Sequence, residues 1–283
     1  MSINLFAILK SENPIKLINI SSNIQNELAS LTNNAQEYLQ KEKILFDGQY
    51  KPENDQILEI KNFTLPFDID FDNPLNLEKI EVNDIDLIKG LIINDKKIIG
   101  FQSFDRRKII EPNRLNIIFR GNTFSKLEDK GITIDDKLDV VFSKQNNFLL
   151  FYSYHNASKV LDLSEYYREA TEQEINSFFA PKIFSDIPEN LDETIDTRMK
   201  KKIFLIKKNK IMEKLKDANI FREVAKYSKT LGLDNYFDST AEKIKIPDDK
   251  KEFKKIISFL NEDLYKSPIS EIIYETNSKR KFG

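Results

Sequence analysis

The 283-residue chain contains no cysteine and no tryptophan, a single histidine at position 155, and seven glycines. The lack of cysteine excludes disulfides, thiolate catalysis and cysteine-ligated zinc or iron–sulfur sites, and it suits a reducing compartment. Because His155 is the only histidine, histidine-triad chemistry, zinc binding by two histidines and His–Asp phosphohydrolase chemistry all lack their parts. Seven scattered glycines cannot form the phosphate-binding loops of nucleotide-binding motifs. The commonest routes to metal-dependent and nucleotide-hydrolysing catalysis therefore lack their parts.

Long apolar runs are also missing. No window approaches the roughly 18 apolar residues of a membrane-spanning helix. The first 16 residues, MSINLFAILKSENPIK, have too short an apolar run for a signal peptide and no basic leader. We therefore expect a cytoplasmic protein without a bound cofactor.

The charge of the chain is unevenly distributed. Hydrophobic residues make up 40% and charged residues 32%, as in a folded protein, and the net charge is −2. Residues 182–283 hold 23 Lys and Arg against 18 Asp and Glu, a net charge of +5, whereas residues 1–181 carry −7. Because the overall pI is 5.8, binding to nucleic acid would require one concentrated basic patch.

Hydrophobic periodicity predicts an α+β protein with a strand-rich region over residues 1–155 and a mainly helical region over residues 156–283. Turn formers at Asn94-Asp95 and Gln145-Asn146 each predict a hairpin. The segments predicted in the first region are a helix over 24–41 and strands over 3–9, 44–46, 56–63, 85–93, 97–104, 115–119, 139–142 and 147–154.

Two helices and a structured terminus are predicted in the second region. A cap at Asp192 or Thr194 begins a long helix that continues to Lys216, and a second helix covers residues 217–231. The last 31 residues predict an amphipathic helix, a turn at Pro268, a short strand and a basic tail. Because this terminus is rich in apolar residues, we expect it to be docked into the fold.

The densest basic cluster is RMKKKIFLIKKNKIMEKLK, residues 198–216, in which nine basic residues are opposed by Glu213 alone. An apolar stripe would bury one face of this helix and leave lysines on another face, where they could follow a phosphate backbone. The alternative is a solvated helix with no ligand. We expect the lysines that are candidate DNA contacts to lie on the solvent side, and they are Lys200, Lys201, Lys202, Lys207, Lys208 and Lys210.

Two smaller basic segments are further candidates for DNA contact. Arg106, Arg107 and Lys108 follow a predicted strand, and their guanidinium groups could hold phosphate oxygens. The alternative is a surface turn whose arginines meet the acidic surplus of the same region. The basic tail adds Lys279 and Arg280.

One enzymatic constellation also fits the residues. Asp47 follows an apolar run, and Glu59 precedes Lys61 by two positions on a later predicted strand. This order of residues occurs in metal-dependent restriction-type nucleases, where the carboxylates hold Mg²⁺ and the lysine orients the attacking water. Such spacing arises easily in a chain with 46 acidic and 44 basic residues.

The C-terminal pattern FLNEDLYKSPISEIIYETNSKRK, together with FDRRKI and the segments LDVVF and NFLLFYS, resembles the B component of the Kiwa anti-phage defence system. The most specific match is Leu260-Asn261-Glu262-Asp263, followed by Tyr274 and by Ser278-Lys279-Arg280. The resemblance elsewhere is one of layout and order.

This resemblance implies a bacterial protein that binds DNA non-enzymatically and obstructs phage replication. It also implies a small transmembrane A component as partner, which could recruit the protein to the inner face of the membrane. Our first expectation for its own assembly is a homodimer. A Mg²⁺-dependent nuclease and an adaptor that binds protein partners alone remain the alternatives.

Overall fold

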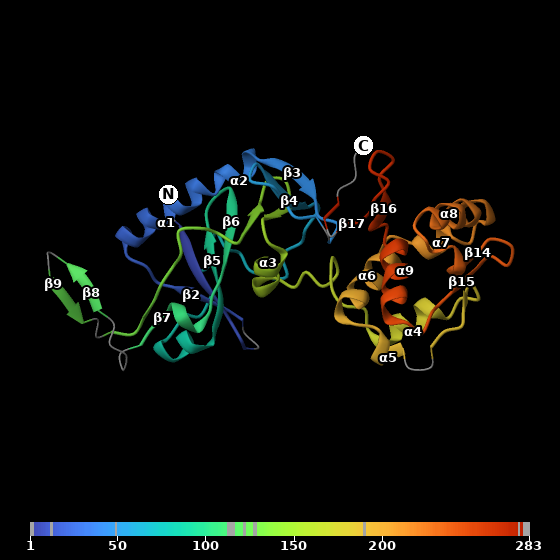
Figure 1. Ribbon diagram of the computed structural model, residues 1–283. Coiled ribbons are helices and arrows are strands. Elements are labelled where there is room, and N and C mark those ends of the chain that lie inside the picture. Colours follow the sequence, from blue (N-terminus) through green and yellow to red (C-terminus); the bar gives the residue numbers. More distant parts are fainter. Residues whose placement is uncertain are drawn as a thin grey trace. The chain divides into compact units, whose positions relative to one another are not determined.

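The computed structural model describes residues 3–11, 14–48, 50–111, 117–120, 123–126, 129–188, 191–276 and 278–279. The chain divides into two compact units, Met1–Phe46 with Lys51–Leu163 and Asp47–Tyr50 with Ser164–Gly283. The first contains a large mixed sheet, and the second contains most of the helices (Figure 1). This arrangement confirms the predicted α+β class.

The first unit is built on an eight-stranded sheet with the order β2-β1-β5-β6-β11-β12-β4-β3. Its neighbouring strands are antiparallel, apart from the parallel pair β3 and β4. Both predicted hairpins are present, as β5–β6 and β11–β12. The strands are β1 Asn4–Leu9, β2 Ile15–Ile18, β3 Glu42–Leu45, β4 Gln56–Ile60, β5 Ile88–Asn94, β6 Ile98–Ser103, β11 Val140–Ser143 and β12 Phe148–Phe151.

Helices cover both faces of this sheet, so its inner strands are continuous apolar runs. On one face, Leu28 and Leu31 of α1 (Ser22–Asn34) share an apolar cluster with Leu5 and Leu91. Helix α2 (Gln36–Gln40) follows after a break at Ala35, so the single predicted helix is two helices. On the other face, α3 (Tyr154–Val160) packs on β5 and β6.

Short elements complete the first unit. Strand β7 (Ile109–Ile110) pairs with β10 (Gly131–Ile132), and β8 (Ile117–Arg120) pairs with β9 (Thr123–Lys126). Two 3₁₀ turns cover Val82–Leu87 and Arg106–Lys108. The predicted strand over 115–119 overlaps β8.

The second unit is centred on α6, which contacts α4, α7 and α9. A small sheet has the order β13-β15-β14, and a separate hairpin pairs β16 with β17. The helices are α4 Glu172–Phe179, α5 Leu191–Thr194, α6 Thr197–Lys208, α7 Ile211–Lys214, α8 Ala218–Thr230 and α9 Lys250–Leu260, with a 3₁₀ turn at Asp234–Tyr236. The strands are β13 Phe184–Ser185, β14 Phe237–Asp238, β15 Lys243–Lys245, β16 Leu264–Lys266 and β17 Ile273–Glu275.

The C-terminal segment is docked in part. Phe253, Ile256 and Ile257 of α9 are completely buried in the core of the second unit, as its amphipathic pattern predicts. Burying one such side chain contributes about 1.5–3 kcal/mol. The hairpin beyond it is different, because Ile269 is 95% exposed and Ile272 is 55% exposed. The expectation that this apolar run docks into the fold is therefore confirmed for α9 and wrong for the end of the hairpin that carries Ile269 and Ile272. The base of the hairpin is docked, because Leu264 packs against the core and Glu275 pairs with Lys202.

Candidate functional site

Helix α6 carries most of the predicted DNA contacts, but it is shorter than expected. Asp196 begins it, since its side chain accepts a hydrogen bond from the backbone N–H of Met199 at 2.9 Å. The helix ends at Lys208, and Lys210 adopts a left-handed φ of 55° before α7. The predicted continuous helix to Lys216 is thus interrupted by this turn, which changes the direction in which the later lysines lie.

Lys202 is buried, which corrects the expectation that it faces solvent. Its Nζ lies 2.9 Å from Oδ2 of Asp263 and 3.0 Å from Oε1 of Glu275, and it donates to Ser258 Oγ at 2.7 Å. The side chain is 7% exposed. Burying an ammonium group is unfavourable unless it is paired and hydrogen-bonded, and these three partners meet that condition. Lys202 therefore has a structural position inside the second unit.

Lys279 belongs to the same network. Its Nζ contacts Oδ1 of Asp263 at 3.0 Å and donates to the backbone carbonyl of Asn261. The Asn261 side chain also donates to both carboxylate oxygens of Asp263. The Asp263 side chain, which is 1% exposed, thus contacts two ammonium groups and accepts hydrogen bonds from one amide. This network fastens the end of the chain to α6 and α9, while Arg280 lies outside the described residues.

Lys207 and Lys208 donate hydrogen bonds to neighbouring residues of their own unit. Lys207 donates to Ser177 Oγ at 2.6 Å and to the carbonyl of Glu174 at 3.2 Å. Lys208 donates to the carbonyls of Tyr166 and Glu165 at 2.9 and 3.3 Å. Partial burial lowers the pKa of Lys208. Both lysines keep their positive charge near the surface, but they would have to leave these acceptors to bind a phosphate directly.

Three cations of α6, namely Arg198, Lys201 and Lys202, line a cavity of about 280 Å³, which we call the basic pocket. Arg198 and Lys201 are one helical turn apart on the same face, and neither has a carboxylate in ion-pair contact within the described residues. Lys200 and Lys210 are likewise without such a partner among those residues, but they do not line the cavity. The full lining of the basic pocket is Gly48, Tyr167, Arg198, Lys201, Lys202, Leu205 and Asp263.

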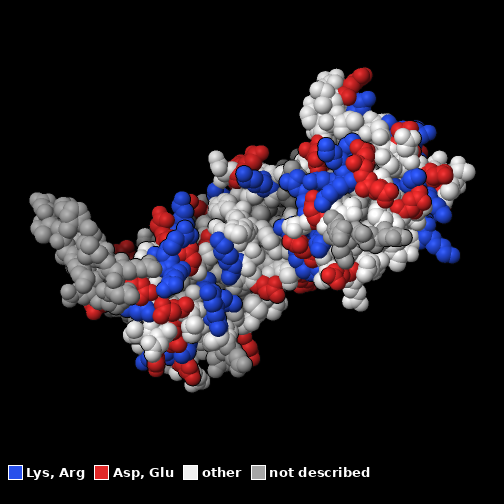
Figure 2. Space-filling model, turned by 60° about the horizontal axis from the view of Figure 1, so that its bottom comes forward, with Lys and Arg blue, Asp and Glu red and all other residues white. Residues whose placement is uncertain are grey.

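Tyrosines flank the cations of this helix. The Lys201 ammonium lies 5.7 Å from the centroid of the Tyr167 ring, and that of Lys208 lies 5.0 Å from the centroid of Tyr166. Burial and the nearby Asp263 carboxylate raise the pKa of Tyr167, so this tyrosine stays neutral at pH 7. Figure 2 shows Lys and Arg side chains on both units, with acidic side chains among them.

The second predicted basic segment, Arg106 to Lys108, is largely engaged by acidic residues of its own unit. Arg107 donates to both carboxylate oxygens of Asp105, at 3.2 and 2.8 Å, and this hydrogen-bonded pair lowers the pKa of Asp105 to about 2. Lys108 pairs with Asp135 at 2.6 Å. Arg106 is exposed, with no ion pair among the described residues. This geometry agrees with the surface-turn alternative for two of the three cations.

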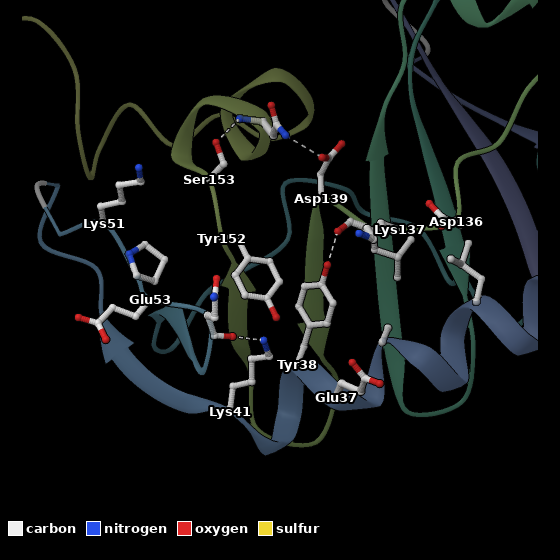
Figure 3. A pocket seen from close by; sticks show the side chains of 16 residues that line it. Glu37, Tyr38, Lys41, Lys51, Glu53, Asp136, Lys137, Asp139, Tyr152 and Ser153 are labelled. Carbon is white, nitrogen blue, oxygen red and sulfur yellow. Dashed lines mark hydrogen bonds between the residues drawn. The ribbon is translucent and has the colours of Figure 1, made fainter.

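A larger cavity of about 840 Å³ lies in the first unit, where α2, the loop 51–54 and the β12–α3 junction meet (Figure 3). The Tyr38 hydroxyl donates to the carbonyl of Leu138 at 2.5 Å, and its ring meets that of Tyr152 edge to face at 4.9 Å. Burial raises the pKa of Tyr38. Both signs of charge line this cavity, from Glu37, Glu53, Asp136, Asp139, Lys41, Lys51 and Lys137. It therefore lacks the excess of one charge that the basic pocket has.

The residues of the predicted nuclease constellation fall in different units. Glu59 and Lys61 belong to the first, and Asp47 belongs to the second. The Glu59 side chain is 8% exposed, and its Oε2 lies 3.8 Å from the Lys61 ammonium. In the part of the chain that the structure describes, no three His, Cys, Asp or Glu side chains are grouped so as to hold a metal ion. His155, predicted at a strand end, lies in the first turn of α3.

Sequence reasoning missed the two residues that define the pocket best. Arg198 was part of the basic cluster but not of the predicted contacts, although its spacing of three residues from Lys201 places both on one helical face. Tyr167 carried no signal of its own. Nothing in the sequence near Asp263 indicates that it pairs with a lysine 61 positions earlier.

Comparison with known proteins identifies the family. Among the residues that the structure describes, no helix is both long enough and apolar enough to cross a membrane. No curated protein and no solved structure matches the chain. The profile of one family, Kiwa protein KwaB-like, matches residues 87–270, which is more than half of the chain and includes the whole of α6 and α9. The chain therefore belongs to the KwaB-like family of the Kiwa anti-phage defence system.

Proposed function

We propose that this protein acts in anti-phage defence by binding DNA through the α6 surface of its second unit, without cleaving it. The observation that carries the proposal is the pair Arg198 and Lys201, two cations on one helical face that lack a carboxylate partner among the described residues and line one pocket. Each cation that neutralises a phosphate releases a condensed counterion, which favours binding. Membership of the Kiwa family supplies the biological setting.

The tyrosines beside this surface support the same proposal. Aromatic rings offer flat faces on which unpaired bases stack, and a neighbouring cation adds attraction to the phosphate. Tyr166 and Tyr167 each lie under a lysine of α6. A strip that alternates cations and aromatic rings suits contact with a nucleic-acid backbone or with a single-stranded segment.

The proposal includes a protein partner. In the Kiwa system we expect a small transmembrane A component to hold this protein at the membrane. We also expect this protein to associate with itself, as a homodimer. The exposed hairpin β16–β17 favours a protein contact, because Ile269, Ile272 and Ile273 are 95%, 55% and 46% exposed. A function as an adaptor that binds proteins alone is thus the second candidate.

The test is a salt titration of DNA affinity, measured by the fluorescence anisotropy of labelled duplex and single-stranded DNA between about 50 and 200 mM salt. Lys202 is left unchanged, since its neutralisation would disturb the buried network. The test variant combines Arg198→Gln, Lys200→Gln and Lys201→Gln. The control variant removes the same charge from exposed residues of the second unit, by Lys182→Gln, Lys226→Gln and Lys229→Gln.

For the wild type we expect the logarithm of the affinity to fall linearly with the logarithm of salt concentration, by about 0.9 for each phosphate neutralised in duplex DNA. The test variant should flatten this slope by roughly two to three units, and the control variant by less than one. Equal slopes in both variants would show that the DNA interface does not lie on α6. If the wild type binds no DNA at the lowest salt, the DNA-binding proposal is wrong and the adaptor function is favoured. Cleavage of DNA in the presence of Mg²⁺ that disappears in Glu59→Ala would establish the nuclease alternative.

A further inference from the structure

The charges around the basic pocket leave a surplus of two positive charges. Four charged groups form the network around Asp263, namely the ammonium groups of Lys202 and Lys279 and the carboxylates of Asp263 and Glu275, and of these Lys202 and Asp263 are buried. These two cations and two anions balance one another. The pocket's other charged residues are Arg198 and Lys201, which add two positive charges to its walls.

The neighbours of Asp263 prevent it from cancelling this surplus. Asp263 contacts two ammonium groups at 2.9 and 3.0 Å and the Asn261 amide at 3.1 and 3.0 Å. Both carboxylate oxygens of Asp263 therefore already accept hydrogen bonds from residues of the network. A carboxylate that is buried and fully hydrogen-bonded repels a nearby anion much less than a free carboxylate does, because its partners neutralise its charge.

The size of the basic pocket restricts the ligand to a small group. Cavities that hold drug-sized molecules usually measure about 300–1,000 Å³, and this one measures about 280 Å³. A single phosphate group fits within such a volume. The remaining part of the ligand would extend out of the mouth of the pocket.

Gly48 keeps this space open. Its φ is 94°, a left-handed conformation that side chains rarely adopt, and a Cβ atom there would lie 2.8 Å from Cδ2 of Tyr167 and 3.0 Å from Cδ2 of Leu205. Residue 48 can therefore lie against the pocket wall only while it is a glycine. Tyr167 in turn lies beside the Lys201 ammonium and forms the neutral part of the lining.

We propose that the basic pocket binds one phosphomonoester dianion, with Arg198 and Lys201 as its two counter-charges and the Lys202–Asp263 pair as its floor. The ligand would be the terminal phosphate of a DNA strand or of a free nucleotide. This inference rests on the proposed function, because it names the group that the same surface recognises. It goes further by separating a terminal phosphate, with two negative charges, from the internal phosphodiesters, which carry one each.

The first experiment uses inorganic phosphate without DNA, titrated into the full-length protein at constant ionic strength and followed by calorimetry. Arg198→Gln with Lys201→Gln should weaken phosphate binding at least tenfold, which corresponds to about 1.4 kcal/mol. The charge-preserving pair Arg198→Lys with Lys201→Arg should retain most of the affinity. Lys226→Gln with Lys229→Gln, on the exposed surface of α8, should bind phosphate as the wild type does.

The second experiment identifies the source of the phosphate. Short oligonucleotides with a 5′-phosphate or a 5′-hydroxyl are compared with adenosine monophosphate, each at pH 5 and pH 7. The second ionisation of a phosphomonoester lies near pH 6, so binding should strengthen as pH rises through this range. A preference for the 5′-phosphate that the double Gln variant loses would assign the pocket to a DNA end. Tight binding of the mononucleotide without that preference would assign it to a free nucleotide.

Each failure has a separate meaning. If wild type and the double Gln variant bind inorganic phosphate equally, or if the wild type binds none up to millimolar concentration, the pocket is not a phosphate site. Loss of all DNA binding with intact phosphate binding would overturn the proposed function and leave the pocket assignment standing. If the wild type binds DNA but no inorganic phosphate, the pocket assignment is overturned and the proposed function stands.

Discussion

The two units solve the burial of polar groups in different ways. In the first, two buried amide side chains link the sheet to its loops: Gln102 donates to the carbonyls of Asp135 and Lys137, and Asn94 donates to that of Phe71. The Glu59 carboxylate is also buried there, and its Oε2 lies 3.8 Å from the Lys61 ammonium. In the second, the buried polar link is an ion pair, in which the Lys202 Nζ lies 2.9 Å from Oδ2 of Asp263. A core with neutral polar groups resists changes in salt and pH, whereas one with paired charges depends on both partners.

The comparison also explains where the candidate site lies. Burying a charge requires several partners, so the second unit keeps α6, α9 and the C-terminal strand close around Lys202 and Asp263. The same helix face then presents Arg198 and Lys201 at the edge of that network. The first unit has a larger cavity but mixed charges in its lining. The two cavities therefore differ as candidate anion sites in the net charge of their linings, and not in the order of their sizes.

The largest effect should follow removal of the buried lysine. Lys202→Met takes one of its two ammonium partners from the buried Asp263 carboxylate and also removes the ion pair of Glu275. We therefore expect the free energy of unfolding to fall by about 3–5 kcal/mol. Urea unfolding at pH 7 measures this loss. The control is Lys200→Met, two positions earlier on α6 and without an ion pair among the described residues, which should cost less than about 0.5 kcal/mol. Similar stabilities for the two variants would show that the network contributes little.

A smaller effect is expected from overpacking the sheet of the first unit. A Cβ atom at Gly100 of β6 would lie 2.4 Å from Cδ1 of Leu138, which is buried and has little room to move. Gly100→Ala should therefore lower the unfolding free energy by about 1–3 kcal/mol, and this loss should not change between low and high salt. Gly131→Ala is the matched control, because the nearest atoms to its Cβ lie at 3.7 and 3.8 Å. A salt-dependent loss in Gly100→Ala would remove the proposed contrast between the units.

The third prediction concerns the start of α4. Glu174 accepts hydrogen bonds from Arg168 and from the backbone N–H of Thr171, and the Arg168 pair above all lowers its pKa from 4.5 to about 2. A lowered pKa stabilises the folded state above the unfolded value of 4.5, and this stability is lost as pH falls toward 2. Glu174→Gln should cost about 1 kcal/mol at pH 7.

The difference between Glu174→Gln and the wild type should shrink as pH falls from 5 to 2. Thermal unfolding across this range tests it, with Glu172→Gln as the control in the same helical turn. A constant difference at every pH would show that the ionisation of Glu174 is not the source of its stabilising effect.

The smallest effect is expected at the exposed hairpin. Because Ile269 and Ile272 are 95% and 55% exposed, replacing both with Ser should change the free energy of unfolding by less than about 0.5 kcal/mol. Ile257→Ala, in the completely buried part of α9, should cost about 2–5 kcal/mol. A large loss in the hairpin variant would show that this segment is part of the core. An unchanged fold would instead make the variant a clean reagent for testing partner binding.

The sequence by itself determined the α+β class, the hairpins β5–β6 and β11–β12 and the helices α8 and α9, because these follow from local hydrophobic periodicity and turn formers. It also located the basic cluster, since charge is a property of composition. It did not indicate the pairing of β1 with β2. The break at Lys210 was not predictable, because lysine gives no sequence signal for a left-handed conformation.

Only the tertiary structure decided which lysines are available. Lys201 and Lys202 are adjacent and chemically identical in the sequence, yet one lines the pocket wall beside Tyr167 and the other is paired with Asp263. Their difference depends on α9 and the C-terminal strand, which the chain brings to α6 from more than 50 residues away. Long-range packing sets the burial of each ammonium group, and burial decides whether its charge is neutralised inside the protein or remains for a ligand.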